Sequence, residues 1–234
     1  QKETSDELKK LNRVLLLNSH INNLIIRTPN QEKLFEEICR IAVNYGGYLM
    51  SWVGLVDNTD KTIYSAARNG FEDGYLANIK KISVLDIPEG KGPSGTAIRE
   101  GKTVICNDIA NDANMLLWRK EALQRKYHSA ISIPINVQSK TIGAFTLYSD
   151  KINTFSNLEE VALLENITRN VSFCLESILI EGERKKHLEK IQQLSKAVEQ
   201  SPVSVVITDN RGQIEYANQK FLETTGYNME EVVG

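Results

Sequence analysis

The residues best suited to redox chemistry are three cysteines, Cys39, Cys106 and Cys174. Thiol-based reduction needs a nucleophilic thiolate and a second, resolving thiol within reach. Cys39 falls on the apolar side of an expected helix, Cys106 in an expected strand and Cys174 in a later helix, so the spacing offers no local pair. We interpret all three as buried structural thiols and expect no catalytic residue in this chain.

Histidines and a glycine-rich loop could bind a metal or a phosphate. His20, His128 and His187 stand far apart, so they predict no metal site, although a haem or metal ligand at His128 remains open. The loop EGKGPSGT (residues 89–96) lacks the G-x-x-x-x-G-K-[ST] order of a phosphate-binding loop. It is more simply a turn before a helix, with Ser94 as a possible cap. No cofactor is required by the sequence.

Polar side chains alternate with apolar ones in two expected strands. In residues 129–136, Ile131, Ile133 and Ile135 point one way, and the mixed row that contains Ser132 points the other way. The apolar row suits a face packed under helices, whereas the mixed row suits a cavity that holds something polar. Thr146 and Tyr148 share one face of the next strand, so we expect a small-molecule pocket there.

The expected pocket is closed by a flap, the helix predicted from Ala113 to Lys126. Asp108 precedes this flap; an aspartate there usually satisfies backbone amides of its loop, and a ligand-binding role stays open. We expect a chamber beneath Trp118 that is roomy enough for a metabolite. The alternative is a set of ordinary half-buried sheet residues under a closed flap. The candidate pocket residues are Met50, Trp52, Asp108, Trp118, Ala122, Ser132, Thr146 and Tyr148.

The elements that position these residues alternate between helices and strands. Helical periodicity covers residues 7–26, 31–45 and 158–196. Strands are predicted at 48–56, 62–67, 103–106, 128–137 and 141–148. The pattern predicts an α+β fold with a largely antiparallel sheet, a helical layer on one face and the pocket on the other.

Composition excludes several classes of partner. The net charge is −2 with acidic and basic residues interspersed, which predicts no nucleic-acid binding. No apolar run approaches the ~18 residues of a membrane span, and the polar N-terminal stretch lacks the apolar core of a signal peptide. Few, widely spaced cysteines indicate reduced thiols, so we expect a cytoplasmic protein without membrane contact.

An ordered set of motifs resembles a bacterial GAF domain. These motifs are WVGLVD, GPSGTAIREGKTVICNDI, WRKEAL, SAISIPI, IGAFTLYSD and FSNLEEVALLENI, and they span roughly residues 30 to 178. The resemblance implies a six-stranded sheet and a sensory, ligand-binding role in a larger signalling protein. Other GAF proteins reduce free methionine sulfoxide or anchor a bilin through a Cys-His pair, which is missing here. A redox or haem sensor, or an enzyme like methionine sulfoxide reductase, is therefore a further alternative.

Residues 201–234 resemble the opening of a PAS sensory domain. The order of apolar strand, DNRG turn, second strand, ANQKF and TGY carries the resemblance. The stretch covers about a third of such a domain, so we expect the remaining strands outside these residues. We expect the hairpin at 203–216 to be mobile or docked on another chain, because its edges lack a sheet.

The closing helix predicts a homodimer. Its apolar residues repeat at spacings close to seven, which is typical of a two-stranded coiled coil. Alternatively, the first half of this helix packs on the sheet. Asn18 and Asn22, which interrupt the stripe of the first helix, fit a dimer contact. The repeat consists of Leu164, Ile167, Val171, Leu175, Ile178, Leu188, Ile191, Leu194 and Val198.

These observations divide the chain into four parts. We expect a dimerisation helix at 1–28, a GAF domain at 29–180, a helical stalk at 181–199 and the start of a PAS domain at 200–234. The predicted function is a sensory module that binds an unidentified small molecule and relays the change through the stalk to output domains elsewhere. A non-binding dimerisation or spacer module is the alternative.

Overall fold

The computed structural model describes residues 2–25 and 30–233, and for residues 2–11 the backbone alone. Contacts divide the chain into two units, Gln1–Ile178 and Leu179–Gly234. The expected boundary after the first helix, between residues 28 and 29, lies outside the described residues. Within those ranges, no helix is long and apolar enough to cross a membrane.

The first unit is built on a six-stranded antiparallel sheet of order β3-β2-β1-β6-β5-β4. This arrangement confirms the predicted α+β fold. The strands are β1 (Met50–Val56), β2 (Thr62–Gly70), β3 (Ile82–Ser83), β4 (Val104–Cys106), β5 (Ser129–Val137) and β6 (Lys140–Ser149). The helices are α1 (Lys2–Ile25), α2 (Gln31–Asn44), α3 (Tyr75–Asn78), α4 (Pro93–Glu100), α5 (Arg119–Gln124) and α6 (Leu158–Glu199), with short 3-10 turns η1 (Pro88–Gly90) and η2 (Ala113–Met115).

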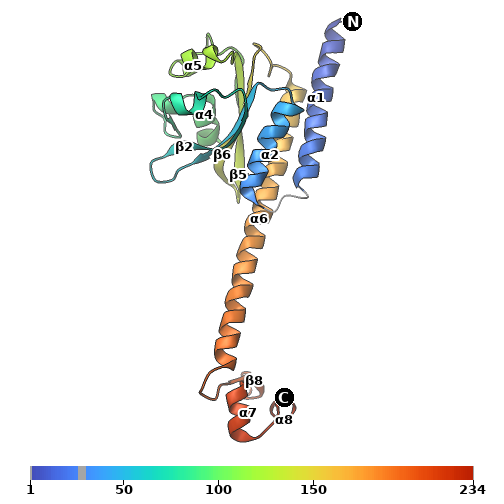
Figure 1. Ribbon diagram of the computed structural model, residues 1–234, viewed down its shortest axis with the longest axis vertical. Coiled ribbons are helices and arrows are strands. Elements are labelled where there is room, and N and C mark those ends of the chain that lie inside the picture. Colours follow the sequence, from blue (N-terminus) through green and yellow to red (C-terminus); the bar gives the residue numbers. More distant parts are fainter. Residues whose placement is uncertain (1, 26–29, 234) are drawn as a thin grey trace. The chain divides into compact units, whose positions relative to one another are not determined.

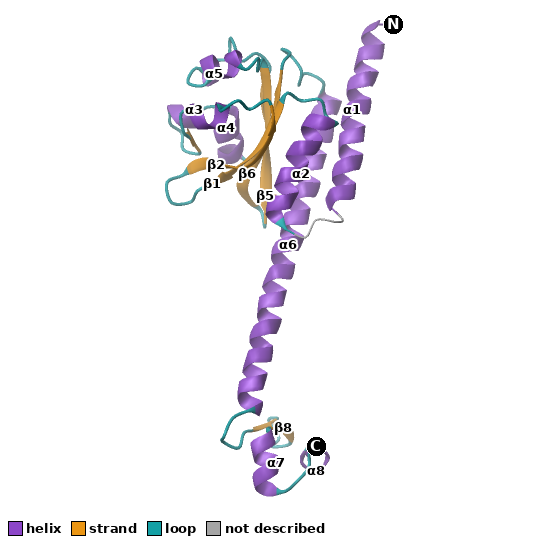
Figure 2. Cartoon of the chain, in the orientation of Figure 1, coloured by secondary structure: helices purple, strands orange, loops and turns teal. Residues whose placement is uncertain are grey.

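Helices cover the two faces of this sheet unequally (Figures 1 and 2). The long helices α1, α2 and α6 lie on one face, whereas the short helices α3, α4 and α5 lie on the other. Ile131, Ile133 and Ile135 are buried in the core of the long-helix face, so the predicted orientation of this row is confirmed. The opposite row of β5 and β6 therefore faces the short helices.

Polar side chains join α1 to α6. Arg13 donates to Glu160 over 2.7 Å, and Asn170 donates to Asn22 over 2.9 Å. The partners advance together along both helices, so α1 and α6 run parallel. Asn22 also donates to Asn18. The asparagines that were expected to mark a dimer contact are thus used inside this chain.

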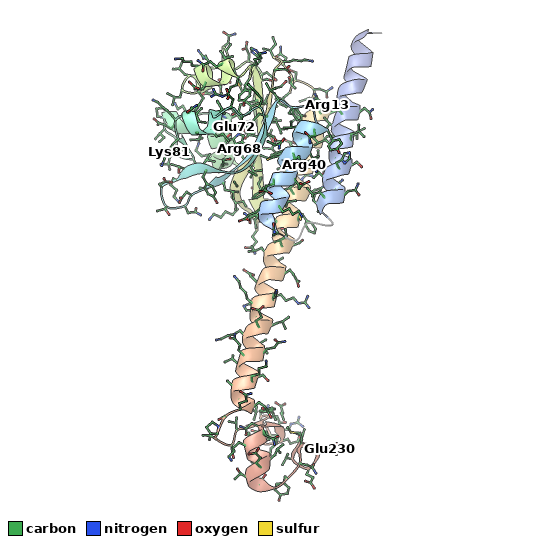
Figure 3. All side chains as sticks on the ribbon, in the orientation of Figure 1. Arg13, Arg40, Arg68, Glu72, Lys81 and Glu230 are labelled. Atoms are coloured by element: carbon green, nitrogen blue, oxygen red, sulfur yellow. The ribbon has the colours of Figure 1, made fainter. Side chains whose placement is uncertain are left out.

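Glu160 is the centre of the buried charge on this face. Only 1% of its side chain is exposed, compared with 27% of that of Arg13 (labelled in Figure 3). The Tyr48 hydroxyl donates to the same carboxylate oxygen over 3.2 Å, and the Arg13 guanidinium lies 4.9 Å from the Tyr48 ring centre. Burial and the charge of Glu160 raise the pKa of Tyr48.

The first half of α6 packs on the sheet, as one of the two interpretations of this helix predicts. Leu164, Ile167, Val171 and Leu175 are all buried in the core of the first unit. They cannot also form a seam with another copy, so the apolar repeat of α6 is not one continuous coiled coil.

The second unit contains the rest of α6, a two-stranded hairpin and two short helices. The hairpin pairs β7 (Val206–Thr208) with β8 (Ile214–Ala217), and α7 (Gln219–Thr225) and α8 (Met229–Val232) follow. Asn218 holds this unit together, because its buried amide donates to the carbonyls of Val198 and Val203 and accepts from the amides of Val205 and Phe221.

Candidate functional site

Seven of the eight predicted pocket residues lie on the short-helix face of the sheet. Of these, Met50, Trp52, Trp118, Ala122 and Tyr148 belong to one buried cluster, hereafter the aromatic cluster. Sequence reasoning missed Tyr75 and Tyr127, which are fully buried in it. Tyr75 follows a turn and Tyr127 ends the flap, so neither stands in an alternating strand pattern that would have marked it.

Ser132 and Thr146 meet a helix rather than an open chamber. Ser94 of α4 lies 3.2 Å from the Ser132 hydroxyl and 3.0 Å from that of Thr146, and the last two lie 2.8 Å apart. All three side chains are buried. Ser94 was expected as a helix cap, but Gly92 occupies the cap position of α4. The closed triangle of hydroxyls thus fixes α4 to the sheet.

Three tyrosines surround the centre of the aromatic cluster. The rings of Tyr127 and Tyr148 stack with centroids 4.6 Å apart, and Tyr75 meets both edge-on. The hydroxyls of Tyr75 and Tyr148 lie 3.5 Å apart. Burial raises the pKa of Tyr148 to about 12 and that of Tyr75 well above its ordinary value. These phenols therefore stay neutral and protonated at neutral pH and act as hydrogen-bonding groups within the cluster.

The flap is not the single helix that was expected. It divides into η2 and α5, with Trp118 at the cap of α5. The Trp118 indole N–H donates to the carbonyl of Lys80 over 3.2 Å, and Arg125 donates to the carbonyl of Asp73 over 2.6 Å. Trp118 itself is buried, with 3% of its surface exposed. These bonds tie the flap to the loop around α3.

The chamber beneath the flap is filled by side chains in this conformation. The remaining void has a volume of about 10 Å³, room for at most one water molecule. The expectation of a space roomy enough for a metabolite is therefore wrong for this conformation. The reason is packing: the Trp118 ring and α4 occupy the space that the sheet leaves open. Its lining is Tyr75, Ile82, Gly92, Pro93, Ser94, Met115, Trp118 and Tyr148.

One polar atom in the aromatic cluster has no well-formed hydrogen bond. Trp52 is 1% exposed, and its indole N–H makes no hydrogen bond of ordinary distance and angle among the described residues, although it is near enough to the Tyr148 hydroxyl to lower the pKa of that group. A buried donor without a good partner costs about 1–3 kcal/mol. An entering molecule with an acceptor atom would therefore compete only with the Tyr148 hydroxyl for this donor.

Asp108 and Cys106 do not form a reactive centre. Asp108 accepts from the side chain of Asn111 and the backbone of Ala110, and the Asn111 bond is the main cause of its lowered pKa. Asp108 thus stabilises its own loop and does not line the void. Burial, followed by the Asp112 carboxylate, raises the pKa of Cys106 to about 12. Cys39 and Cys174 lie in the core on the opposite side of the sheet, so the described residues contain no thiol pair with Cys106.

Larger hollows lie outside the aromatic cluster. A pocket of about 320 Å³ opens beside α4 and β4, with Lys91, Arg99 and Asp112 on its walls. An open groove of about 710 Å³ runs between the edge of β5 and α6. Among the described residues, no group of histidine, cysteine or carboxylate side chains is placed to hold a metal ion.

Comparison with known proteins gives two family matches. Residues 28–176 match the family model of a GAF domain, and residues 190–234 match that of a PAS domain. No protein of curated function matches the chain in sequence.

Similar solved structures share the fold of the first unit. Free methionine-R-sulfoxide reductase from Neisseria meningitidis, in complex with its substrate, has a TM-score of 0.59 at 16% identity over 70% of this chain and 89% of that one. The GAF domain of a phosphoenolpyruvate-protein phosphotransferase from Coxiella burnetii has a TM-score of 0.59 at 14% identity over 74% and 98%. The corresponding Acinetobacter domain has a TM-score of 0.56 at 11% identity over 73% and 97%. At these identities the likeness concerns the fold alone.

Proposed function

Because this chain belongs to the GAF domain family, we propose that it is a sensory module of a signalling protein and that a small molecule binds between the sheet and the flap. The flap and α4 separate to admit it, and the new contacts favour one arrangement of the module over another. The match of residues 190–234 to a PAS domain supports a sensory role for the whole chain.

The observation that carries this proposal is the buried Trp52 N–H, which lacks a hydrogen bond of ordinary geometry, in a cluster rich in aromatic rings. Ligand pockets typically combine an apolar, aromatic lining with a few polar groups that fix orientation. The Trp52 N–H and the Tyr75 and Tyr148 hydroxyls supply such groups here. The flap is bonded to the loop around α3, whereas α4 is bonded to the sheet, so the two can separate while each keeps its own anchor.

Native mass spectrometry of the protein purified from its own host tests this proposal. We expect a bound compound that denaturation releases. Trp52→Phe removes the free donor and should reduce the retained fraction at least tenfold, whereas Phe155→Leu, which shrinks a buried ring on the opposite face, should not. A protein without bound compound, or equal retention by both variants, would contradict ligand binding at this site.

Helix α6 is the element suited to pass the change on. It begins in the core of the first unit and continues to Glu199 in the second. In this proposal the chain is a homodimer through its terminal helices, and binding shifts α6 between two arrangements. The three free thiols fit a reducing compartment, so the proposal places the protein in the cytoplasm.

A non-binding dimerisation or spacer module is the second candidate. The observation in its favour is the filled interior, whose void of about 10 Å³ admits no metabolite without movement of the flap. In that case the protein purified from its own host should carry no bound compound, and Trp52→Phe should leave its oligomeric state unchanged. Native mass spectrometry, which reports bound compound and oligomeric state together, separates the two candidates.

Our proposal assigns no catalysis to this chain. The separation of the cysteines and the raised pKa of Cys106 weigh against a thiol-based enzyme, because the thiolate is the reactive form. Titration with a thiol reagent at pH 7.5 tests this point. One rapidly reacting cysteine would revive the redox alternative, and a Soret band in the purified protein would revive haem.

A further inference from the structure

The Trp118 ring fills a space that only a glycine leaves open. A Cβ atom at Gly92 would lie 2.6 Å from Cζ3 of Trp118, and its next two neighbours would be atoms of the same ring. The backbone of Gly92 has φ −64°, which any residue adopts, so the conformation of the chain does not call for glycine there. Glycine is needed only because the ring approaches so closely. The indole thus occupies a slot, hereafter the Trp118 slot, between Gly92 and the rest of the aromatic cluster.

The hydrogen-bonding groups at this slot can serve a ligand as well as they serve Trp118. The Trp118 N–H donates to the backbone carbonyl of Lys80 over 3.2 Å. A carbonyl oxygen accepts from any suitably placed N–H, so a donor on a ligand can take over this bond. In the same cluster, the buried Trp52 N–H lacks a hydrogen bond of ordinary geometry, and an acceptor on a ligand would improve its pairing. The site therefore offers one acceptor and one donor to a ring of indole size.

The lining of the void beside this slot is uncharged. Among the described residues, its walls are apolar, aromatic or hydroxyl-bearing. The Arg125 guanidinium lies 5.7 Å from the Tyr75 ring centre. Its N–H groups are already committed, and their acceptors are the carbonyls of Glu72, Asp73 and Glu121 and the Glu121 carboxylate. Because burying an ionised group without a partner is costly, these walls suit an uncharged ligand.

We propose that the Trp118 slot is itself the ligand site, that its ligand is an uncharged, planar bicyclic aromatic molecule with one hydrogen-bond donor and one acceptor, and that the Trp118 ring is a resident substitute which leaves when the ligand enters. The inference rests on the proposed function and names its ligand class. It also accounts for the void of about 10 Å³, because the slot is already filled by the ring. The resident ring lowers the apparent affinity, since only molecules with the ring displaced can bind.

Binding of benzimidazole to the full chain tests the ligand class. Benzimidazole is a bicyclic aromatic molecule with one N–H donor and one ring-nitrogen acceptor, and it is uncharged at pH 7.5. We expect saturable binding in isothermal titration calorimetry together with a red shift of tryptophan emission, because the Trp118 ring moves into water. The carboxylate and aminomethyl derivatives of benzimidazole keep the ring and add a charge, so they should bind at least tenfold more weakly. No saturable binding of benzimidazole, or equal affinity for the charged derivatives, would overturn the proposed class.

Trp118→Ala tests whether the ring is a substitute for the ligand. This variant empties the slot, and an apolar cavity of about 150 Å³ takes up benzene. We expect it to bind benzimidazole at least tenfold more tightly than the native chain does. N-methylbenzimidazole has no donor for the Lys80 carbonyl and should bind this variant at least tenfold more weakly than benzimidazole. Trp118→Leu, which keeps part of the apolar packing, should show the same order of affinities if the alanine variant does not fold.

Phe155→Ala is the matched control, since it empties a buried ring site in the core on the opposite face of the sheet. An equal gain in affinity for benzimidazole in Phe155→Ala and Trp118→Ala would overturn the role of Trp118, and so would equal affinities for benzimidazole and its N-methyl derivative.

The compound identified by native mass spectrometry separates this inference from the proposed function. An uncharged aromatic compound supports both. A retained acid, amine or phosphate ester refutes the ligand class and leaves ligand binding intact. A protein without bound compound contradicts the proposed function, and the inference falls with it.

Discussion

Gly92→Ala should create a steric clash with the Trp118 ring of the flap. A Cβ atom at Gly92 would lie 2.6 Å from Cζ3 of Trp118, and ordinary contact begins at 3.4 Å, so the ring edge must retreat by about 0.8 Å. The backbone of Gly92 has φ −64°, which alanine adopts without strain. The whole effect is therefore directed at the Trp118 ring.

The expected loss of stability follows from two contributions. Overpacking a buried site costs about 1–3 kcal/mol. Displacing the indole also strains its hydrogen bond to the carbonyl of Lys80, which contributes about 0.5–1.5 kcal/mol. We expect a net loss of about 2 kcal/mol and a red shift of tryptophan emission. Both tryptophans, Trp52 and Trp118, lie in the first unit, so urea unfolding followed by their fluorescence reports on that unit.

Two other glycines provide matched controls. A Cβ at Gly95 would meet the carbonyl oxygens of Ser83 and Gly90, which are backbone atoms that cannot turn aside, so Gly95→Ala should cost more than Gly92→Ala. A Cβ at Gly182 meets nothing within 4 Å, and Gly182→Ala should stabilise its helix by up to about 1 kcal/mol. The reasoning is refuted if Gly92→Ala behaves like Gly182→Ala, with neither lost stability nor shifted emission.

Three further predictions concern groups outside the flap. Arg13→Ala leaves the buried carboxylate of Glu160 without its cation and should lower the unfolding free energy, measured in urea, by about 3 kcal/mol. Adding Glu160→Gln should recover part of this loss. No recovery would contradict a stabilising ion pair between the two side chains. Asn218→Ala removes four hydrogen bonds from the second unit. Hydrogen exchange of the β7–β8 amides should therefore accelerate at least tenfold. An unchanged exchange rate would show that other contacts hold the hairpin. Burial raises the pKa of Cys39 to about 12, so above pH 9 the unfolded thiol ionises and the folded one does not. This thiol alone contributes a fall in stability of about 1.4 kcal/mol per pH unit between pH 9 and 12. Other buried thiols and phenols add to the slope, so Cys39→Ala should lessen it by that amount, and an identical slope in urea unfolding at several pH values would contradict the burial of this thiol.

The orientation of the strands could be predicted from sequence because one face of each strand must be buried under the helical layer. Ile131, Ile133 and Ile135 can be buried together only under an apolar helical layer, and the period of two then fixes the position of Ser132. This local rule was enough to place Thr146 and Tyr148 on the same face as the flap, whereas for Trp52 the alternation alone was less decisive. It also predicted all six strand positions but one, the two-residue β3.

The filled chamber and the flap could not be predicted from the same rules. Whether Ser132 faces a cavity or the hydroxyl of Ser94 depends on how closely α4 approaches the sheet, and that distance is set by Gly95 lying against the carbonyl of Ser83. The residues 113–126 have helical periodicity throughout, yet the structure divides them at Trp118, and periodicity alone carries no signal of that break. Asn22 likewise has the same sequence signature whether its partner is Asn170 of its own chain or a residue of another copy.

The parallel contact between α1 and α6 restricts how these helices can move. The contacts Arg13–Glu160 and Asn22–Asn170 lie more than two helical turns apart along α1. Each contact forms only when its two residues lie at the same level along the parallel helices. A slide by one turn, 5.4 Å, would separate both pairs in a single step and leave Glu160 desolvated beside no guanidinium. Any displacement of α1 along α6 therefore raises the free energy. The two helices move together or separate completely, so a force on one helix acts on the other directly and not through the sheet.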